Sequence, residues 1–227
     1  MDQNTTFLRP AARPERVTLT GHYVRLEPLD PAVHTDSLWQ RVGSLAHEKI
    51  WLYMPDGPFA ERLAFEQHME NKAKSQDPLF FAIVDLASGN AAGRATLMRI
   101  DPANAVIEIG GIVFSPALQR SREATEAMYL FARYVFEDLG YRRYEWKCNA
   151  LNEPSRRAAL RLGFTFEGIF RQHMIIKGKN RDTAWYSMLD SEWPARKREL
   201  ERWLDESNFD SAGQQKTRLN ESAPQRS

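Results

Sequence analysis

The feature that most constrains this sequence is a β-like run that passes, through a turn without glycine, into a long amphipathic helix and then into another strand. The run covers residues 105–114. In residues 119–139 apolar side chains recur with the period of an α-helix, and Gly140 follows at the position of a C-terminal cap. Residues 141–150 then alternate apolar and charged side chains, which is typical of a strand with one buried face. This order predicts a crossover between parallel neighbours in one sheet.

The patterns on either side of this unit indicate how the sheet is completed. Two more β-like runs precede it, separated by turn-forming residues, as expected for antiparallel neighbours. In chain order, the other predicted elements are a strand in 17–30, helices in 32–45 and 59–75, strands in 79–86 and 93–100, a short helix from 152, a hairpin in 164–190 and a closing helix in 191–204. We therefore expect an α/β fold with a mixed, mostly antiparallel central sheet and helices on both faces.

The length of the chain favours one domain, because 227 residues can bury a good core as a single unit. Residues 1–16 are polar and interrupted by proline, so we expect a flexible N-terminal segment there. Residues 206–227 contain almost no apolar side chains, so we expect a disordered tail. The domain itself is predicted to cover residues 17–205.

The overall charge and the cysteine content exclude several classes of protein. The formal net charge is only +1, which argues against a general nucleic-acid or membrane-binding surface. Cys148 is the single cysteine, so no internal disulfide can form, and the five histidines lack the spacing of metal ligands. No apolar stretch approaches the length of a membrane helix, and the first residues lack the apolar centre of a signal peptide. We expect a cytoplasmic protein that binds no metal, nucleic acid or membrane.

Two separated motifs carry the functional signal. Residues 107–128 read IEIGGIVFSPALQRSREATEAM, and residues 148–168 read CNALNEPSRRAALRLGFTFEG. The first resembles the cofactor strand and pyrophosphate turn of the GNAT superfamily of acetyl-CoA-dependent N-acetyltransferases. The second resembles that family's later N-x-x-S-x(7)-G-F segment, in the branch that includes the ribosomal-protein N-terminal acetyltransferases. The resemblance covers roughly residues 18–190. It implies a GNAT-like acyl-CoA N-acyltransferase fold and direct transfer from acetyl-CoA to a primary amine of a small molecule or a peptide N-terminus.

The turn QRSREA, at residues 119–124, departs from the family's usual Q/R-x-x-G-x-G/A, because it holds no glycine. A helix N-terminus binds anions through unpaired amides and its dipole, so backbone geometry matters more than glycine as such. The alternative is that the arginines of this turn are ordinary solvated side chains at the start of a surface helix. The resemblance implies cofactor contacts from the turn residues Gln119, Arg120, Ser121, Arg122, Glu123, Ala124 and Thr125, and from the strand backbone at Ile112, Val113 and Phe114.

Glu108 is the candidate general base and also a candidate contact for a cationic amine. It is the sole charge within the apolar strand segment VIEIGG, so burial should raise its pKa towards a value useful for proton abstraction. The paired Gly110 and Gly111 indicate a bulge or a close backbone approach just after it. The alternative is a glutamate on a solvent-facing edge of the sheet.

Three polar side chains near the second motif are further candidates. The resemblance implies that Asn149 and Asn152 contact the pantetheine arm, although Asn152 could instead cap the short helix, or do both. Ser155 stands where this branch places a hydroxyl near the cofactor sulfur, so it could protonate or solvate the leaving thiolate. It could equally be an ordinary first-turn serine. The tyrosine that other branches carry as an acid is Ala159 here.

The acceptor side is less defined by the sequence. Trp51 and Tyr53 lie in the loop-like segment 46–60, where the resemblance places an acceptor wall, but they could equally be core or dimer contacts. The aromatic-rich hairpin makes a homodimer plausible. Cys148 is expected to be a small buried core residue rather than a nucleophile. A rival interpretation is a non-catalytic CoA-binding sensor or interaction module, because the turn lacks glycine and the acid tyrosine is absent.

Overall fold

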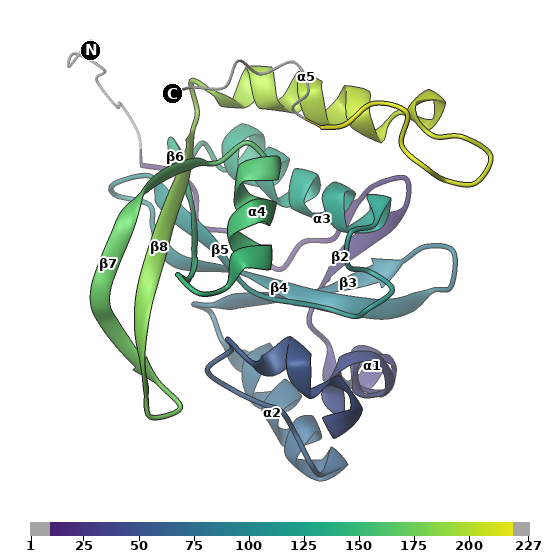
Figure 1. Cartoon of the computed structure of the whole chain (residues 1–227), viewed down its shortest axis with the longest axis vertical. Helices are drawn as coiled ribbons and strands as arrows, with labels where there is room; N and C mark the ends of the chain where they lie inside the picture. Colours follow the sequence, from purple (N-terminus) through teal and green to yellow (C-terminus); the bar gives the residue numbers. More distant parts are fainter. Residues whose placement is uncertain (1–9, 220–227) are drawn as a thin grey trace.

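The structure is a computed structural model that describes residues 10–219, and in these residues eight strands form one sheet (Figure 1). The strands lie in the order β1-β2-β3-β4-β5-β6-β8-β7. Their bounds are β1 Leu19–Thr20, β2 Val24–Pro28, β3 Leu79–Asp85, β4 Asn90–Asp101, β5 Val106–Phe114, β6 Arg143–Asn149, β7 Thr165–Ile176 and β8 Lys179–Leu189. The β5–β6 pair is parallel and the other neighbouring pairs are antiparallel. The predicted mixed, mostly antiparallel sheet is confirmed.

Helices cover both faces of this sheet, as expected (Figure 1). On one face lie α3, α4 and α5, and on the other lie α1 and α2. The α-helices are α1 Pro31–Leu38, α2 Arg62–Lys74, α3 Arg122–Arg133, α4 Glu153–Arg161 and α5 Trp193–Leu204, with shorter helical turns η1 Trp39–Gly43, η2 Leu45–Trp51, η3 Tyr134–Asp138 and η4 Glu206–Asn208. Each face of the sheet buries its own apolar cluster, because the strands alternate their side chains between the two.

The crossover from β5 to β6 runs through α3. The buried side of α3 packs on the sheet through residues such as Ala127, Leu130 and Phe131. The predicted helix 119–139 begins later than expected, since residues 119–121 form a turn, and its last residues form the wider turn η3. Gly140 then takes a φ of +73°, the left-handed conformation that ends the helix.

Pairing between β5 and β6 stops before either strand ends. Residues of β5 from Val106 to Ile109 pair with β6, whereas β5 continues to Phe114 and β6 to Asn149. At the same place β5 carries a bulge, in which Gly111 has a φ of +56°. A side chain at Gly111 would also approach Thr96 to 2.9 Å, so this position requires glycine. The edge of β5 therefore becomes free of β6 just beyond Glu108.

The two chain ends differ from the expectation of flexible segments. Ala11 is buried, and the amides of Ala11 and Ala12 donate to the carbonyls of Pro102 and Leu139. Near the other end, Phe209 packs edge-on against Trp203. Described residues near both ends thus contact the domain, Ala11 and Ala12 through backbone hydrogen bonds and Phe209 through the ring of Trp203 on α5. Residues 1–9 and 220–227 lie outside the described part of the chain.

The helices described between residues 10 and 219 are all too short or too polar to cross a membrane.

Candidate functional site

The start of α3 offers unpaired backbone amides. Arg120 adopts the left-handed conformation, with a φ of +61°, in the position just before the helix cap. In the described residues, the amides of Arg120, Arg122 and Glu123 have no hydrogen-bond partner. Unpaired amides that follow a left-handed residue at a helix start form a concave anion-binding arrangement. The turn therefore presents unpaired amides at a helix start, which is the backbone geometry of an anion-binding arrangement, although it has no glycine.

The Ser121 hydroxyl is not free for a ligand, contrary to the sequence prediction. Its oxygen accepts the amide of Ala124 at 3.0 Å, and the hydroxyl donates to the carbonyl of Leu118 at 2.7 Å. Ser121 is thus the N-cap of α3. Its bond to the Ala124 amide also removes that amide from the predicted diphosphate contacts.

Two other side chains of this turn have protein partners as well. The Gln119 amide donates to the carbonyl of Phe114 at 3.1 Å. The Thr125 hydroxyl donates to the carbonyl of Ser121 at 3.2 Å and accepts from Arg161 at 3.1 Å. These side chains thus hydrogen-bond within the protein and shape the turn, and the groups of the turn without a protein partner in the described residues include the backbone amides of Arg120, Arg122 and Glu123.

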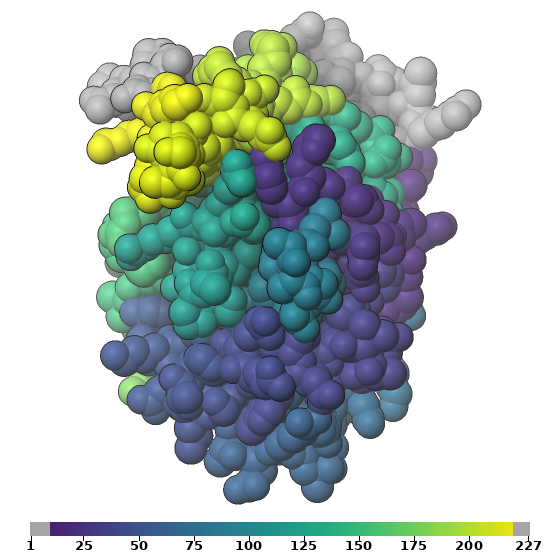
Figure 2. Space-filling model, turned by 90° about the vertical axis from the view of Figure 1, so that its right-hand side faces the viewer, coloured from purple at the N-terminus to yellow at the C-terminus, as the bar shows by residue number. Residues whose placement is uncertain are grey.

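Arg122 is held between aromatic rings. Its guanidinium carbon lies 3.8 Å from the ring centroid of Tyr23 and 4.7 Å from that of Phe209. In Figure 2 the segments that carry these residues, in teal, purple and yellow, meet on one face of the molecule. The C-terminal segment thus packs beside the start of α3, and the stacking fixes the Arg122 guanidinium instead of leaving it solvated.

Glu108 lies on the sheet face opposite α3 and is 5% exposed, so it is not a solvent-facing edge residue. Its Oε2 pairs with Lys147 Nζ at 2.9 Å and with Arg99 Nε at 3.0 Å. A side chain added at Gly110 would lie 3.4 Å from Oε1, so this second oxygen is directed towards the bulge in β5. In the described residues, Oε1 accepts no hydrogen bond.

The pKa of Glu108 is raised, as the sequence suggested. Burial raises the pKa of this carboxyl above its ordinary value, and the positive charges of Lys147 and Arg99 reduce the shift without cancelling it. Lys147 is itself buried and also binds Glu145 Oε2 at 2.6 Å. The site thus holds one carboxyl whose pKa is raised, and this carboxyl belongs to a network of paired charges.

The second motif places Ser155 beside the free end of β6. Its hydroxyl oxygen accepts the indole N–H of Trp146 at 3.0 Å. Burial raises the pKa of the neighbouring Cys148 thiol, while a hydrogen bond from Ser155 opposes that shift. Cys148 is 5% exposed, in agreement with the expected core position. A hydroxyl at this place can donate a hydrogen bond to sulfur.

The two asparagines both order the turn between β6 and α4. Asn152 Oδ1 accepts the amide of Ser155 at 3.3 Å, so Asn152 is a helix cap. Asn149 Oδ1 accepts the amide of Leu151 at 2.9 Å. In the described residues, the side-chain NH₂ groups of both donate no hydrogen bond. They are available to a ligand between β5 and β6.

Trp51 does not form an acceptor wall. It is 0% exposed, and its indole N–H donates to the carbonyl of Val42 at 2.7 Å. The prediction of Trp51 as a substrate contact is therefore wrong for this structure, because the ring packs inside the apolar cluster beneath α1 and α2. Tyr53 is half-buried, and its hydroxyl donates to the carbonyl of Leu151 at 3.1 Å. Tyr53 joins the loop after η2 to the turn that carries the asparagines.

A buried charge cluster anchors the same loop. Arg94 of β4 is 2% exposed, and its guanidinium lies between the rings of Trp51 and Phe80. It lies 3.7 Å from Asp56, which also pairs with His68 at 3.2 Å. Burial, followed by the charge of Arg94, lowers the pKa of His68 to about 4, so this imidazole is neutral near pH 7. Sequence analysis missed this cluster, because it joins residues from three separate elements.

Sequence analysis also missed Arg99 and Lys147, the two partners of Glu108. The alternation in β6 did signal that Glu145 and Lys147 share a charged face. It could not show that this face meets Glu108. Arg99 was hidden within an apparently regular strand, and the bulge that turns it towards Glu108 is visible only in the structure.

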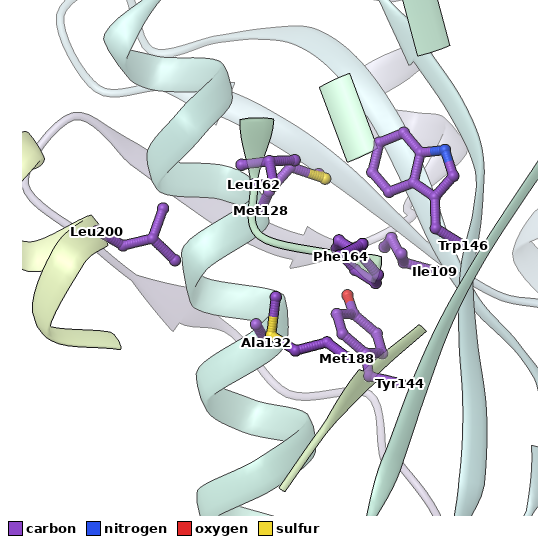
Figure 3. Close-up of a pocket in the computed structure, with 9 residues that line it drawn as sticks. All are labelled: Ile109, Met128, Ala132, Tyr144, Trp146, Leu162, Phe164, Met188 and Leu200. Atoms are coloured by element: carbon purple, nitrogen blue, oxygen red, sulfur yellow. The ribbon is translucent and has the colours of Figure 1, made fainter. Parts of the chain in front are cut away.

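A core cavity of about 10 Å³ lies between α3, α5 and the sheet, and holds at most one water (Figure 3). It is lined by Ile109, Met128, Ala132, Tyr144, Trp146, Leu162, Phe164, Met188 and Leu200. Residues 10–219 contain no group of three or more His, Cys, Asp or Glu side chains able to hold a metal ion.

Comparison with protein families gives one domain match. Residues 24–165, well over half of the chain, match the model described as "Acetyltransferase (GNAT) domain". A protein of Bacillus subtilis (strain 168), named "Putative ribosomal N-acetyltransferase YdaF", is 30% identical over 112 residues. That match covers 49% of this chain and 61% of the B. subtilis protein, so it spans less than two thirds of that relative.

Two solved structures are similar over most of their length. A GCN5-related N-acetyltransferase from Brucella melitensis is 56% identical, with a TM-score of 0.92, and the match covers 94% of this chain and 96% of that one. A structure from Chromobacterium violaceum ATCC 12472, described as a probable acetyltransferase of the GNAT family, is 37% identical with a TM-score of 0.78. There the match covers 86% of this chain and 98% of that one.

Proposed function

We propose, from the premise that this chain belongs to the GNAT family of acetyltransferases, that it transfers an acetyl group from acetyl-CoA to a primary amine. The acceptor is a small molecule or a peptide N-terminus, and the transfer is direct. The observation that carries the proposal is the position of Glu108, a buried carboxylate with one unbonded oxygen at the place where β5 and β6 part. The name of the B. subtilis relative, a putative ribosomal N-acetyltransferase, favours a peptide N-terminus among these acceptors.

The residues present fit a CoA-type ligand. The unpaired amides of Arg120, Arg122 and Glu123 would hold its diphosphate, because they supply donors at the positive end of the α3 dipole. The free edge of β5 at residues 112–114, with the amide groups of Asn149 and Asn152, would hold the pantetheine arm. When bound, acetyl-CoA supplies an acetyl group activated as a thioester.

Glu108 would remove a proton from the acceptor ammonium, directly or through a water molecule. Lys147 and Arg99 hold Oε2, which fixes the carboxylate and leaves Oε1 towards the bulge. A base with a raised pKa takes a proton from an ammonium more readily than an ordinary carboxylate does. The same negative charge attracts a cationic amine.

Ser155 would act on the departing sulfur. Trp146 donates to the hydroxyl oxygen at 3.0 Å, which leaves the hydroxyl proton to be donated to a sulfur, that of Cys148 or that of the departing thiolate. This role takes the place of the acid tyrosine, which is Ala159 here.

The test incubates the full-length protein with acetyl-CoA and a panel of amines that includes peptides with free N-termini. We expect release of free CoA thiol together with an N-acetylated product detected by mass spectrometry. Binding of CoA without acetylation of any amine or peptide would overturn the enzyme proposal and favour the non-catalytic CoA-binding module.

A further inference from the structure

A hollow of about 680 Å³ lies on the sheet face opposite α3, and its lining includes residues at the start of β5 and β6. Its lining includes both cationic partners of Glu108, Arg99 and Lys147, and also Trp185 of β8. The β7–β8 hairpin bends away from the sheet towards the layer of α2 (Figure 1), and Lys177 near its tip donates to the carbonyl of Trp51 at 3.0 Å. The hairpin therefore forms a side wall of the space in front of Glu108.

Two cations of this hollow meet at Glu108. Arg99 and Lys147 both bind Glu108 Oε2, and Lys147 Nζ lies 3.9 Å from the ring centroid of Trp185. Arg181 lies on the same strand and the same face as Trp185. Burial lowers the pKa of His173 in this hairpin, and the charges of Arg99, Arg181 and Lys147 lower it further. The face of β8 that contributes Trp185 to the hollow therefore also carries Arg181, which lies outside the lining.

Arg181 differs from Arg99 and Lys147 because no carboxylate of the described residues pairs with its guanidinium. In residues 10–219, its guanidinium makes no ion pair and no hydrogen bond, and its Nε is buried. Burial lowers the pKa of Arg181, and the charges of Cys148 and Glu108 oppose this shift. A partly buried guanidinium without an anion is unfavourable, so a ligand is the natural source of its partner.

Arg99 is held in place by a strained backbone. Its φ is +49°, a conformation unusual for arginine, and the Asp77 carboxylate accepts the amides of Arg99 and Ile100 at 2.8 and 3.0 Å. Strain that is maintained by specific bonds is typical of functional positions. The Arg99 side chain is 49% exposed beside the hollow, so it can face a ligand while it binds Glu108.

We infer that the acceptor amine carries a carboxylate a few bonds away, which Arg181 binds, with Arg99 beside it, while the amine faces Glu108. The inference rests on the proposed acetyl transfer and names its substrate class. A guanidinium matches the planar geometry of one carboxylate, and the charge-assisted pair orients the ligand as well as binding it. The carboxylate can be that of a free amino acid, or that of an aspartate or glutamate side chain at the first position of a peptide.

The test compares matched acceptors that differ only in the carboxylate. Free amino acids are paired with their carboxamides, and peptides that begin with Asp or Glu are paired with peptides that begin with Asn or Gln. For the wild type, kcat/KM should be at least about 10-fold higher with the carboxylate member, as expected for one charge-assisted pair. The pair of acceptors that shows the larger ratio identifies the source of the carboxylate.

The variant Arg181→Gln should lose this preference, and Arg181→Lys should keep part of it. With the carboxamide acceptors, Arg181→Gln should stay near the wild-type rate. Lys179→Gln is the matched control, because Lys179 is an exposed cation on the same strand and has no partner in the described residues. Calorimetric titrations of the CoA-bound protein with free glutamate and with a peptide that begins with Glu should show a loss of affinity in Arg181→Gln for the ligand whose carboxylate Arg181 binds, and no loss for the matched amides.

The possible outcomes separate this inference from the proposed function. Equal turnover of carboxylate and carboxamide acceptors by the wild type would overturn the inference and leave acetyl transfer standing. An equal fall in the turnover of both acceptors in Arg181→Gln would also overturn it, because Arg181 would then act on the reaction itself. If no amine is acetylated, the function proposal fails, and the titrations alone decide whether Arg181 binds a carboxylate.

Discussion

Replacement of Glu108 by glutamine is expected to lower kcat/KM for acetyl transfer by about 10²- to 10⁴-fold, the usual contribution of a general base. Glutamine keeps the size of the side chain but cannot take a proton. The wild-type pH profile should rise with pH through an ionisation above the ordinary glutamate pKa, because the deprotonated form is active and burial raises the pKa of Glu108. The Glu108→Gln variant should lose this rise of the rate with pH.

The control for this prediction is Glu167→Gln. Glu167 is a carboxylate of β7 that pairs with Arg143 at 2.6 Å, so it belongs to the same charge network without touching Glu108. Its variant should retain a rate close to that of the wild type. Steady-state kinetics over a range of pH, together with circular dichroism of both variants, check the result. A Glu108→Gln protein with the full rate and an unchanged pH profile would remove the base assignment.

Replacement of Glu126 by glutamine is expected to lower the free energy of unfolding by about 3 kcal/mol, the cost of breaking a buried, charge-assisted cluster. Glu126 of α3 is 3% exposed. Its carboxylate accepts the backbone amides of His22, Tyr23 and Val24 at 2.7, 2.7 and 2.8 Å. A glutamine side chain has one acceptor oxygen, and its NH₂ group would face amide donors.

Urea denaturation measures this effect, and Glu123→Gln is the matched control. Glu123 lies one turn earlier on α3 and has no hydrogen-bond partner in the described residues, so its variant should unfold near the wild-type midpoint. The Glu126 cluster also positions Tyr23, on which Arg122 stacks at the start of α3. If Glu126→Gln unfolds at the same urea concentration as Glu123→Gln, the cluster does not stabilise the fold as argued.

The arrangement of the sheet could be predicted because its signals are local. Alternation in β6, helical periodicity in α3 and the turn residues between the earlier strands each reflect a few neighbouring residues. For Glu108 the apolar neighbours in β5 left burial and a solvent-facing edge position both open, and the structure shows that it is buried. The order of these elements then restricted the topology to a crossover between parallel strands.

The side-chain partners in the site could not be predicted, because they come from distant parts of the chain. Ser121 and Thr125 were expected to face a ligand, yet Ser121 caps α3 and Thr125 binds Arg161. Trp51 was a candidate for the acceptor wall. Its indole N–H instead donates to a carbonyl on η1, and the buried Arg94 lies over its ring. The sequence also could not show that Arg181 lacks a hydrogen-bond or ion-pair partner in the described residues, because this depends on which residues the folded hairpin brings near it.

The central claim is that backbone amides at the start of α3 bind the diphosphate, and its most direct test is a calorimetric titration of CoA against Ser121→Asp and Ser121→Asn. Both residues can cap the helix as Ser121 does, so the fold should persist. Only aspartate places a negative charge beside the amides of Arg122 and Glu123. We predict that Ser121→Asp binds CoA at least about 10-fold more weakly than the wild type, as repulsion at a helix N-terminus implies, while Ser121→Asn binds it normally. Equal affinity of both variants for CoA would contradict the account.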